Sequence, residues 1–377
     1  MIHHTESKVI ATNSLILHAA WGIDSRFAVF DIETTGLQSG HHVVYAISLL
    51  LFSTIDTSQP TLHYLQTEAL DEEAELLQTA ASQLSDYPIW LSYNGTAFDL
   101  PFLQNRCRIL ALSKLFQPQR HIDLFRLLLP YRRTLFPNGM RQVQLEELLG
   151  LQRTEFISGE DVIAHYFIYL QTKSRDSFTH LYRHNTDDVC GLAGLLVLGQ
   201  ILLWQQPAYW QSITVETTTD QLRLTAESAY PIPKGLIPLV LKSQPGSDET
   251  IPQTLKLSCE GNRFCLDIPI TRAELRYFFE DYQNYDYLPD EDIAIHRSLS
   301  AFVERGHKKR ATRGTAYAKK TGCFIPLPST ISITEVKQPV FYHSYRSQPA
   351  LIEFDTLPSK EWGKLMAGYL AYLLPGK

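Results

Sequence analysis

The chain contains 377 residues, a length that favours two domains rather than one or three. Hydrophobic residues make up 44% of it and charged residues 20%, which excludes a disordered chain and indicates a globular protein with a buried core. The net charge of −6 provides no general attraction for polyanions, so any surface that binds nucleic acid has to be local.

The first half of the chain alternates apolar strand-like runs with helical patterns. Strands are predicted at residues 27–32, 43–53, 61–67, 88–93 and 121–124. Helices are predicted at residues 71–85, 97–110, 142–149, 161–172 and 177–203. Such an order is typical of a mixed sheet flanked by helices, so we predict an α/β domain over residues 1–205.

The composition changes at residues 205–210, after which β-branched runs alternate with polar residues. Strands are predicted at residues 213–217, 222–225, 239–242, 255–258 and 264–268. Helices are predicted at residues 271–282, 291–304 and 360–374. These elements predict a second, α+β accessory region over residues 206–377, which carries no catalytic motif that we recognise.

The sequence gives no indication of export or of a membrane anchor. Residues 1–10 lack the pattern of a signal peptide. The longest apolar stretch, 191–204, is about 14 residues long and contains Gln200, which is too short to span a bilayer and fits a buried helix. Cys259 and Cys265 flank a predicted hairpin turn, and we interpret them as reduced thiols. We therefore expect a cytoplasmic protein with no membrane contact.

Two acids stand close together in the first predicted strand. Asp31 and Glu33 are two residues apart, so their side chains point to the same face of the sheet. Two carboxylates on one face are costly unless a cation neutralises them, and Mg²⁺ or Mn²⁺ prefers oxygen ligands. Gly36 permits a tight turn after the strand, and Thr34 and Thr35 can offer hydroxyls near the carboxylates.

Three segments together resemble a known superfamily. Residues 31–37, Asp-Ile-Glu-Thr-Thr-Gly-Leu, are similar to the first motif of the DEDD exonucleases, which include proofreading exonucleases and have a ribonuclease-H-like fold. Residues 92–103 match the second motif, in which Asn94 and Gly95 turn the chain and Asp99 begins a helix. Residues 184–189 occupy the place of the third motif and contain Asp188. The resemblance covers residues 26–203 and is nearest to the YprB-like ribonuclease-H-like subgroup, which residues 121–124 and 144–150 also resemble.

The resemblance implies a 3′–5′ exonuclease that hydrolyses phosphodiester bonds at nucleic-acid 3′ ends. It implies that two divalent cations, Mg²⁺ or Mn²⁺, are held by four acids: Asp31, Glu33, Asp99 and Asp188. It further places Thr34, Thr35 and Asn94 near the substrate, a single-stranded 3′ end. The choice between DNA and RNA depends on contacts to the 2′-hydroxyl and stays open, and no protein partner is predicted.

The third motif departs from the two common patterns of the superfamily. One branch has a Tyr four residues before the last Asp, and the other has a His five residues before it. Here His184 and Asp188 are four apart, one helical turn, so they share a face. Tyr182 has the five-residue spacing to Asp187 instead, and it cannot face one site together with Asp188. His184 is either the general base or a polar residue packed at the edge of the site.

Two further groups of residues have alternative interpretations. Asp123 either caps the helix that follows it, which we favour, or supports the metal ligands from outside. Residues 305–320 contain seven cations and no acid, among them Lys308, Lys309 and Arg310. This segment either contacts nucleic-acid phosphates or is a solvated or partner-binding basic face. The aromatic segment 277–287 contains several acids, which favours core packing or a domain interface.

Three functions are compatible with these patterns. The first is an active 3′–5′ exonuclease, which the complete set of four acids favours. The second is a catalytically weak or inactive nucleic-acid-binding module on a nuclease fold, for which the unusual third motif leaves room. The third is a small-molecule phosphoesterase, because a fold does not determine its substrate.

Overall fold

The computed structural model describes residues 1–10, 13–55, 58–112, 114–233, 236–237, 240–243 and 254–374. These residues form two compact units. Of the described residues, unit 1 contains 1–203, 233 and 236, and unit 2 contains 204–232 and those from 237 to 374.

Unit 1 is built on a six-stranded sheet in the order β1-β4-β3-β2-β5-β6. Its strands are β1 (Ile2–Ser7), β2 (Phe27–Thr34), β3 (Val44–Phe52), β4 (Thr61–Gln66), β5 (Ile89–Ser92) and β6 (Arg120–Asp123). The central strand β2 runs antiparallel to β3 and parallel to β5. The predicted mixed sheet is therefore confirmed.

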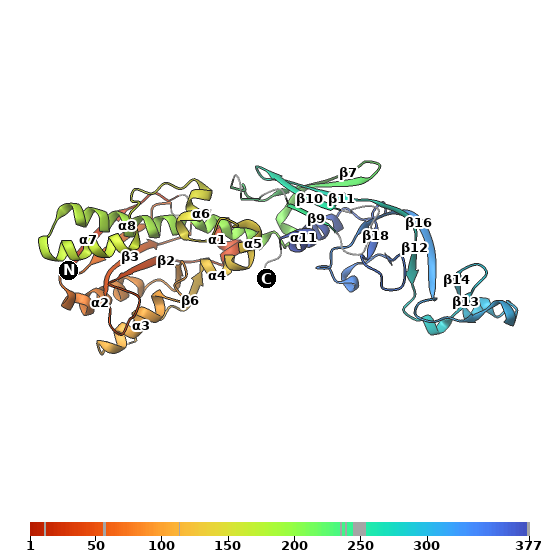
Figure 1. The fold of residues 1–377 in the computed structure, drawn as a ribbon, viewed down its shortest axis with the longest axis horizontal. Coiled ribbons are helices and arrows are strands. Elements are labelled where there is room, and N and C mark those ends of the chain that lie inside the picture. The colour runs from red at the N-terminus through yellow and green to blue at the C-terminus, as the bar shows by residue number, and fades with distance from the viewer. Residues whose placement is uncertain are drawn as a thin grey trace. The chain divides into compact units, whose positions relative to one another are not determined.

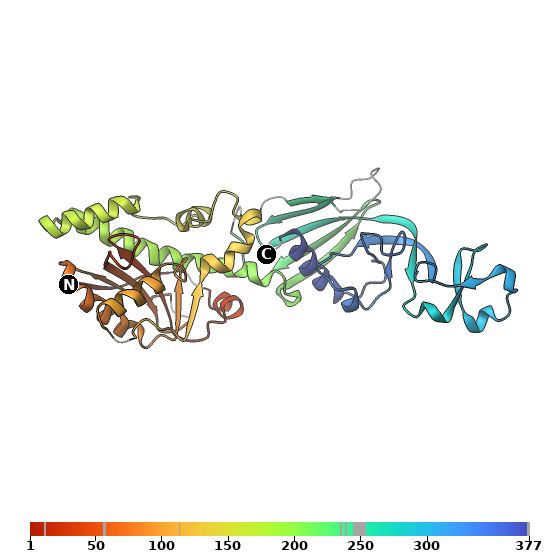
Figure 2. The ribbon, with the colours of Figure 1, turned by 60° about the horizontal axis from the view of Figure 1, so that its bottom comes forward.

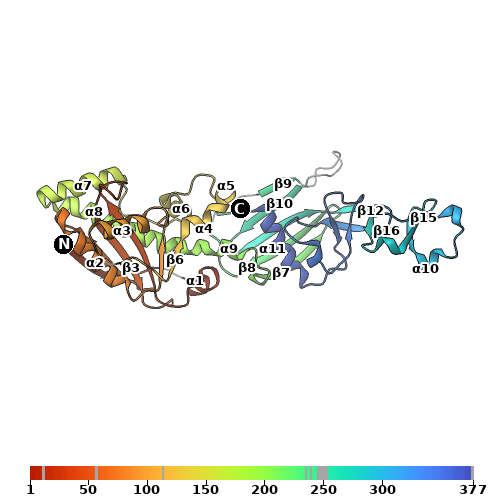
Figure 3. The same ribbon diagram turned by 90° about the horizontal axis from the view of Figure 1, so that it is seen from below.

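Helices cover both faces of this sheet (Figure 1; Figure 3). One face packs on α2 (Glu73–Leu84) and α3 (Asp99–Ile109), and the other on α7 (Gly159–Thr172) and α8 (Arg175–Leu195). Phe30 and Ile32 of β2 belong to the apolar core beneath α2 and α3. Because side chains alternate along a strand, Asp31 and Glu33 lie on the opposite face, toward α8.

The remaining helices of unit 1 are short. They are α1 (Ser14–Trp21), α4 (Leu124–Leu128), α5 (Arg132–Leu135), α6 (Gln142–Leu149) and α9 (Gln200–Leu203), with 3₁₀ turns η1 (Leu70–Glu72), η2 (Leu129–Tyr131) and η3 (Leu196–Gly199). The helix predicted at 177–203 is thus interrupted after α8. At this point the Trp21 indole donates to the Leu196 carbonyl at 2.8 Å and packs against Gly199. Residues 175–203 are long and apolar enough to cross a membrane, but 61% of the apolar window is buried in the protein, as in a core helix.

Strand β1 was absent from the sequence prediction because its residues are mainly polar. It lies at the edge of the sheet, where it pairs with β4 in antiparallel register from Ile2–Gln66 to Ser7–Thr61. His3 and His4 are exposed, and their rings lie beside His63 and Tyr182. An edge strand needs few apolar residues, so its sequence carries little of the usual strand signal.

Unit 2 contains three antiparallel sheets (Figure 2). The first consists of β7 (Trp210–Thr217), β8 (Gln221–Ser228), β11 (Arg263–Pro269), β10 (Thr254–Glu260) and β9 (Val240–Ser243). The second consists of β12 (Thr271–Phe278), β16 (Tyr317–Pro326), β18 (Leu351–Glu353) and β17 (Val340–Phe341). The third consists of β14 (Ile293–His296), β13 (Tyr285–Leu288) and β15 (Lys309–Arg310). The other elements are α10 (Arg297–Ser300), α11 (Glu361–Leu373), η4 (Pro207–Tyr209), η5 (Tyr282–Asn284), η6 (Arg305–His307) and η7 (Ile333–Glu335).

Two helices predicted in this region are wrong. Residues 271–282 form strand β12, which pairs with β16 along its whole length. Ala273, Leu275 and Tyr277 alternate toward one apolar cluster, a period of two that outweighs the helical propensity of the segment. Residues 291–304 contain β14 and the four-residue α10 in place of one helix. The predicted C-terminal helix is confirmed as α11, and all five cysteines are unpaired.

Candidate active site

Strand β2 presents the first two acids of the site. Asp31 pairs across the sheet with Ser48 and Glu33 with Ala46, and the register shifts directly after Glu33. The Tyr45 hydroxyl donates to Oε2 of Glu33 at 3.5 Å. This shift ends the regular ladder where the chain turns away, so the carboxylates lie at the end of the strand.

The turn after β2 is fixed by its own side chains. The Thr34 hydroxyl donates to the Gly36 carbonyl at 2.9 Å, and Oγ1 of Thr35 accepts from the Val43 amide at 3.1 Å. A Cβ at Gly36 would lie 2.7 Å from the His42 imidazole, so close packing requires glycine here. Both hydroxyls therefore shape the turn, and their predicted contact with nucleic acid remains a prediction.

Asp99 enters from the sharp turn between β5 and α3. Asn94 is exposed and has a φ of 63°, and a Cβ at Gly95 would lie 2.2 Å from Oγ of Ser92. Asp123 accepts hydrogen bonds from the amides of Asn94 (2.9 Å) and Thr96 (3.0 Å), and it also caps α4. The predicted capping role of Asp123 is confirmed, and the same carboxylate holds the turn that places Asp99.

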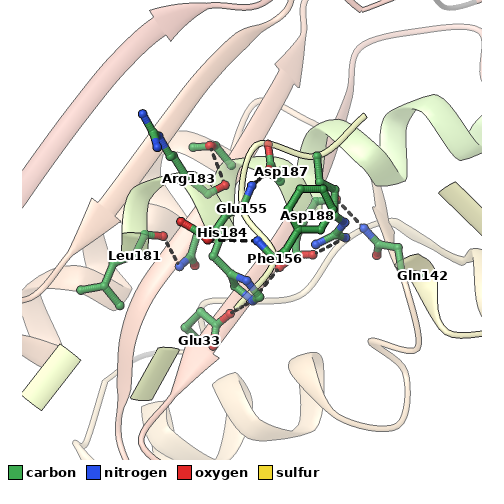
Figure 4. Close-up of polar contacts among 12 residues, drawn as sticks. Glu33, Gln142, Glu155, Phe156, Leu181, Arg183, His184, Asp187 and Asp188 are labelled. Atoms are coloured by element: carbon green, nitrogen blue, oxygen red, sulfur yellow. Dashed lines mark hydrogen bonds and ion pairs between the residues drawn. The ribbon is translucent and has the colours of Figure 1, made fainter. Parts of the chain in front are cut away.

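Helix α8 supplies the last two residues of the site. Nε2 of His184 lies 3.5 Å from Oε1 of Glu33 and 3.4 Å from Oδ2 of Asp188 (Figure 4). One ligand atom from each of these three residues lies within 4.8 Å of the others, close enough to hold a metal ion. Nδ1 of His184 is buried and has no hydrogen-bond partner among the described residues.

The neighbouring candidates of the third motif point elsewhere. The Tyr182 hydroxyl donates to Glu6, on β1. The Asp187 carboxylate accepts from the amides of Thr154 (2.6 Å) and Glu155 (2.9 Å) and fastens the loop before α7. The pair His184 and Asp188 therefore has both side chains at the acids of β2, whereas the pair Tyr182 and Asp187 does not.

A hydrogen-bonded network behind Asp188 was not expected from the sequence. The Arg153 guanidinium donates to Oδ1 of Asp188 at 2.7 Å and forms a bidentate pair with the buried Glu146. The Gln142 amide donates to the Asp188 carbonyl at 2.7 Å and to Glu146 at 2.8 Å. Arg153 lies in a loop and belongs to no motif, so no local signal marked it.

The four acids influence one another electrostatically. Burial, and then the charges of Asp188, Asp99 and Glu33, raise the pKa of Asp31 well above its usual range. Burial and the charges of Asp188 and Asp99 raise the pKa of Glu33 to about 8. Burial is the largest cause that raises the pKa of Asp99 to about 7, against hydrogen bonds from backbone amides. Clustered oxygen ligands that repel each other are the donor set that Mg²⁺ or Mn²⁺ fits.

Comparisons with known proteins agree with this architecture. A family model described as the RNase_H superfamily matches residues 28–198. No curated protein sequence matches the chain. Unit 1 therefore has a ribonuclease H-like fold, with a mixed sheet flanked by helices, and a further β-rich region follows it.

Three solved structures are similar at low identity. The family B DNA polymerase of the archaeon Pyrobaculum calidifontis is 14% identical, with a TM-score of 0.41 over 93% of this chain and 48% of its own. A structure of exonuclease I is 12% identical, with a TM-score of 0.32 over 54% of this chain and 55% of its own. A zinc-bound complex of E. coli exonuclease I with single-stranded DNA is 16% identical, with a TM-score of 0.27 over 43% of each chain. The chain thus spans about half the length of the structures it matches.

Proposed function

We propose that this chain is a metal-dependent 3′–5′ exonuclease of the DEDD superfamily, nearest to its YprB-like subgroup. It would hydrolyse the terminal phosphodiester bond at a single-stranded 3′ end of DNA or RNA. The observation that supports this proposal is the convergence of Asp31, Glu33, Asp99 and Asp188, from three distant segments, with His184 between two of them. The unpaired cysteines support a cytoplasmic location as part of the same proposal.

The four carboxylates would hold two divalent cations, Mg²⁺ or Mn²⁺. The chemistry that such ions supply is a lowered pKa of the attacking water and a stabilised charge on the leaving oxygen. Without a cation, the acids repel the phosphodiester of the substrate. The network of Arg153 and Gln142 would keep Asp188 in place on α8 while its second oxygen, Oδ2, faces the site.

His184 is the proposed general base. Its Nε2 faces the acids and would accept a proton from the attacking water, since an imidazole titrates near neutral pH. Glu33 and Asp188 lie within 3.5 Å of this nitrogen and would stabilise the imidazolium once Nε2 has taken the proton. A general base must have Nε2 within reach of the attacking water, whereas a residue that only packs at the edge of the site need not.

One observation favours the second function, a nucleic-acid-binding module with little or no turnover. Oδ1 of Asp188 accepts a hydrogen bond from Arg153, so only Oδ2 is left toward the other acids. A carboxylate shared with an arginine holds a cation less strongly than a free one. An active exonuclease and a binding module would therefore differ in how strongly Asp188 helps to hold a cation.

One experiment separates these functions. Purified protein is incubated with 5′-labelled single-stranded DNA, RNA and duplex in Mn²⁺, Mg²⁺ or a chelator, with Asp31→Ala as the control. A ladder shortened from the 3′ end, absent in chelator and in the variant, supports the exonuclease. Binding without hydrolysis in either metal supports the binding module. Hydrolysis of a small phosphodiester but of no oligonucleotide would contradict both and favour a phosphoesterase.

A further inference from the structure

Unit 2 contains a groove that the proposed nuclease chemistry does not use. It lies between the end of β12, the segment around η7, and the loop 342–346 that follows β17. Its volume is about 770 Å³, within the range of roughly 300–1,000 Å³ found for sites that bind small molecules. The lining residues used below are Phe278, Glu280, Lys337, Tyr342, Tyr345 and Arg346.

Aromatic rings form much of the wall of this groove. The ring of Phe278 lies edge-on to Tyr345 at 5.3 Å and tilted to Tyr342 at 6.1 Å. Tyr345 keeps 38% of its surface exposed, so its ring is only partly used in packing. A partly exposed aromatic ring that neighbouring rings hold in place is a suitable platform for stacking a planar ligand.

The loop that carries Tyr345 is fastened to β12. Arg276 and Tyr342 exchange two backbone hydrogen bonds of 2.9 Å, and the Arg276 guanidinium donates to the His343 carbonyl at 2.6 Å. Arg346 follows with a φ of 59°, a left-handed conformation that a bulky residue rarely adopts. The groove is therefore largely preformed, which lowers the entropy lost on binding.

The charge of the groove favours an anion. Lys337 and Arg346 line it, and neither has a carboxylate partner in the part of the chain that the structure describes. The Arg346 guanidinium lies 5.3 Å from the centre of the Tyr345 ring, so cation and stacking surface are adjacent. Glu280 is the one acid among its lining residues and can accept from an exocyclic amine.

We propose that this groove binds single-stranded nucleic acid, with a base stacked on Tyr345 and backbone phosphates at Lys337 and Arg346. The proposal rests on the proposed function for the class of ligand and adds a second contact surface for it. A single strand fits better than a duplex because only unpaired bases expose a face for stacking. Such a strand offers both base faces and phosphates, for which the groove has the Tyr345 ring and the cations Lys337 and Arg346.

The test measures binding without hydrolysis. Fluorescence anisotropy of labelled thymidine and uridine oligonucleotides of roughly 12 nucleotides is recorded in chelator at several salt concentrations. Tyr345→Ala is expected to weaken binding roughly tenfold, whereas Tyr345→Phe retains the stacking surface and stays within about twofold of wild type. The double variant Lys337→Gln, Arg346→Gln is expected to lower the salt slope by about 1.4, and Lys360→Gln, an exposed lysine outside the groove, to leave it unchanged.

Three results would overturn the groove proposal: wild-type protein that binds neither oligonucleotide, equal affinity of Tyr345→Ala and wild type, or a mononucleotide that competes as tightly as the oligonucleotide. Because Tyr345 is a partly exposed loop residue, loss of folding is not expected, and thermal unfolding of each variant verifies this. Nucleotide release in Mn²⁺ is measured separately, so loss of the nuclease proposal and loss of the groove proposal give different results.

Discussion

The acids of the site in unit 1 are distant in sequence and close in space. The cations of residues 305–320 in unit 2 are close in sequence, and several of them have acids beside them. Asp31, Asp99 and Asp188 are far apart in the sequence, yet the charges of Asp188 and Asp99 both raise the pKa of Asp31. Apart from Arg153, the described chain supplies no guanidinium or ammonium that is bonded to these acids. Folding thus brings carboxylates together at a place where their mutual repulsion destabilises the folded protein.

The cations of residues 305–320 show the opposite relation. They are close in sequence, but acids of β13, of β18 and of the turn before β14 lie beside three of them. Lys319 lies 2.6 Å from Asp292, and Lys320 lies 2.7 Å from Glu353. Hydrogen bonds from Lys319 and from tyrosine hydroxyls hold the pKa of Asp292 well below its usual range. Arg310 lies 3.7 Å from Asp286.

This difference distinguishes charged residues that indicate a binding site from charged residues that form surface ion pairs. A run of like charge along the chain can be neutralised by the strands beside it and then acts as a set of surface ion pairs. A cluster of like charge that folding brings together and leaves without counter-ions needs a ligand to explain it. On this criterion the acid cluster of unit 1 is the stronger site. In the basic segment, the described residues supply no carboxylate for Arg305, Lys308, Lys309 and Arg313.

The largest expected effect is the loss of an acid from the cluster. Asp31→Ala and Asp188→Ala should each lower metal-dependent nucleotide release by roughly 10³-fold or more, because carboxylates that act as a unit fail together. Release of labelled nucleotide measures this. Asp187→Ala, adjacent to Asp188 but bonded to the loop at Thr154, is the matched control. Near-wild-type turnover of either cluster variant would show that the active site is wrongly assigned.

Arg153 is the cation that interrupts the cluster. Arg153→Met should destabilise the fold by about 3 kcal/mol, since it leaves Glu146 buried without a positive partner. The double variant Arg153→Met, Glu146→Met should recover much of this loss. Urea unfolding measures both. If the single variant is as stable as wild type, the pair does not hold α6 to the loop.

The His184→Ala variant tests the proposed base. Turnover should fall by roughly 10²-fold, and the dependence of kcat on pH should lose the limb that belongs to the base. Thr179→Ala, a change at a partly exposed position of the same helix, controls for effects on α8. An unchanged rate and pH profile would reduce His184 to a packing residue.

The gathered acids also predict how stability depends on pH. Glu33 and Asp99 have pKa values of about 8 and 7 when folded and near 4 when unfolded, so the folded state binds more protons between these limits. The stability they contribute is present below pH 4 and lost as pH rises toward 8. Metal-free protein should be on the order of 5 kcal/mol less stable at pH 8 than at pH 5, and Mg²⁺ or Mn²⁺ should reverse this.

Unfolding in urea with and without metal at both pH values measures this dependence. In the matched variant Glu33→Gln the pH dependence should be smaller, because one titrating group is gone. A metal-free protein that becomes more stable toward pH 8 would contradict the raised pKa values.

The smallest effects concern the basic segment. If it binds phosphates, Lys309→Gln and Arg305→Gln should each lower the salt slope of nucleic-acid affinity by about 0.7. Lys319→Gln should leave the slope unchanged because Asp292 already neutralises it. Charge reversal at Lys308 and Lys309 should flatten the slope further. If all of these variants have the salt slope of the wild-type protein, residues 305–320 do not contact nucleic-acid phosphates.

Much of unit 1 followed from the sequence because its signals are local. The predicted helix at 142–149 has the observed bounds of α6, and Asp31 and Glu33 share a face because strands alternate. The capping of α4 by Asp123 likewise depends on residues next to it in the chain.

Other features depended on contacts between distant residues. The aromatic segment was expected to pack in a core or an interface, and Phe278 does contact Tyr317, but its ring also borders the open groove. Residues 271–278 form strand β12 because β16 supplies their hydrogen-bond partners. The sequence of β12 alone does not show that this partner is present.

The sequence by itself determined which acids can form a metal site, since residue type and spacing fix what a strand end or a helix turn can present. Only the tertiary structure decided that Asp187 is bonded to the loop at Thr154, that Arg153 holds one oxygen of Asp188, and which cations are neutralised. The physical reason is that electrostatic and hydrogen-bond partners are set by distance in space, which the order of residues along the chain does not specify.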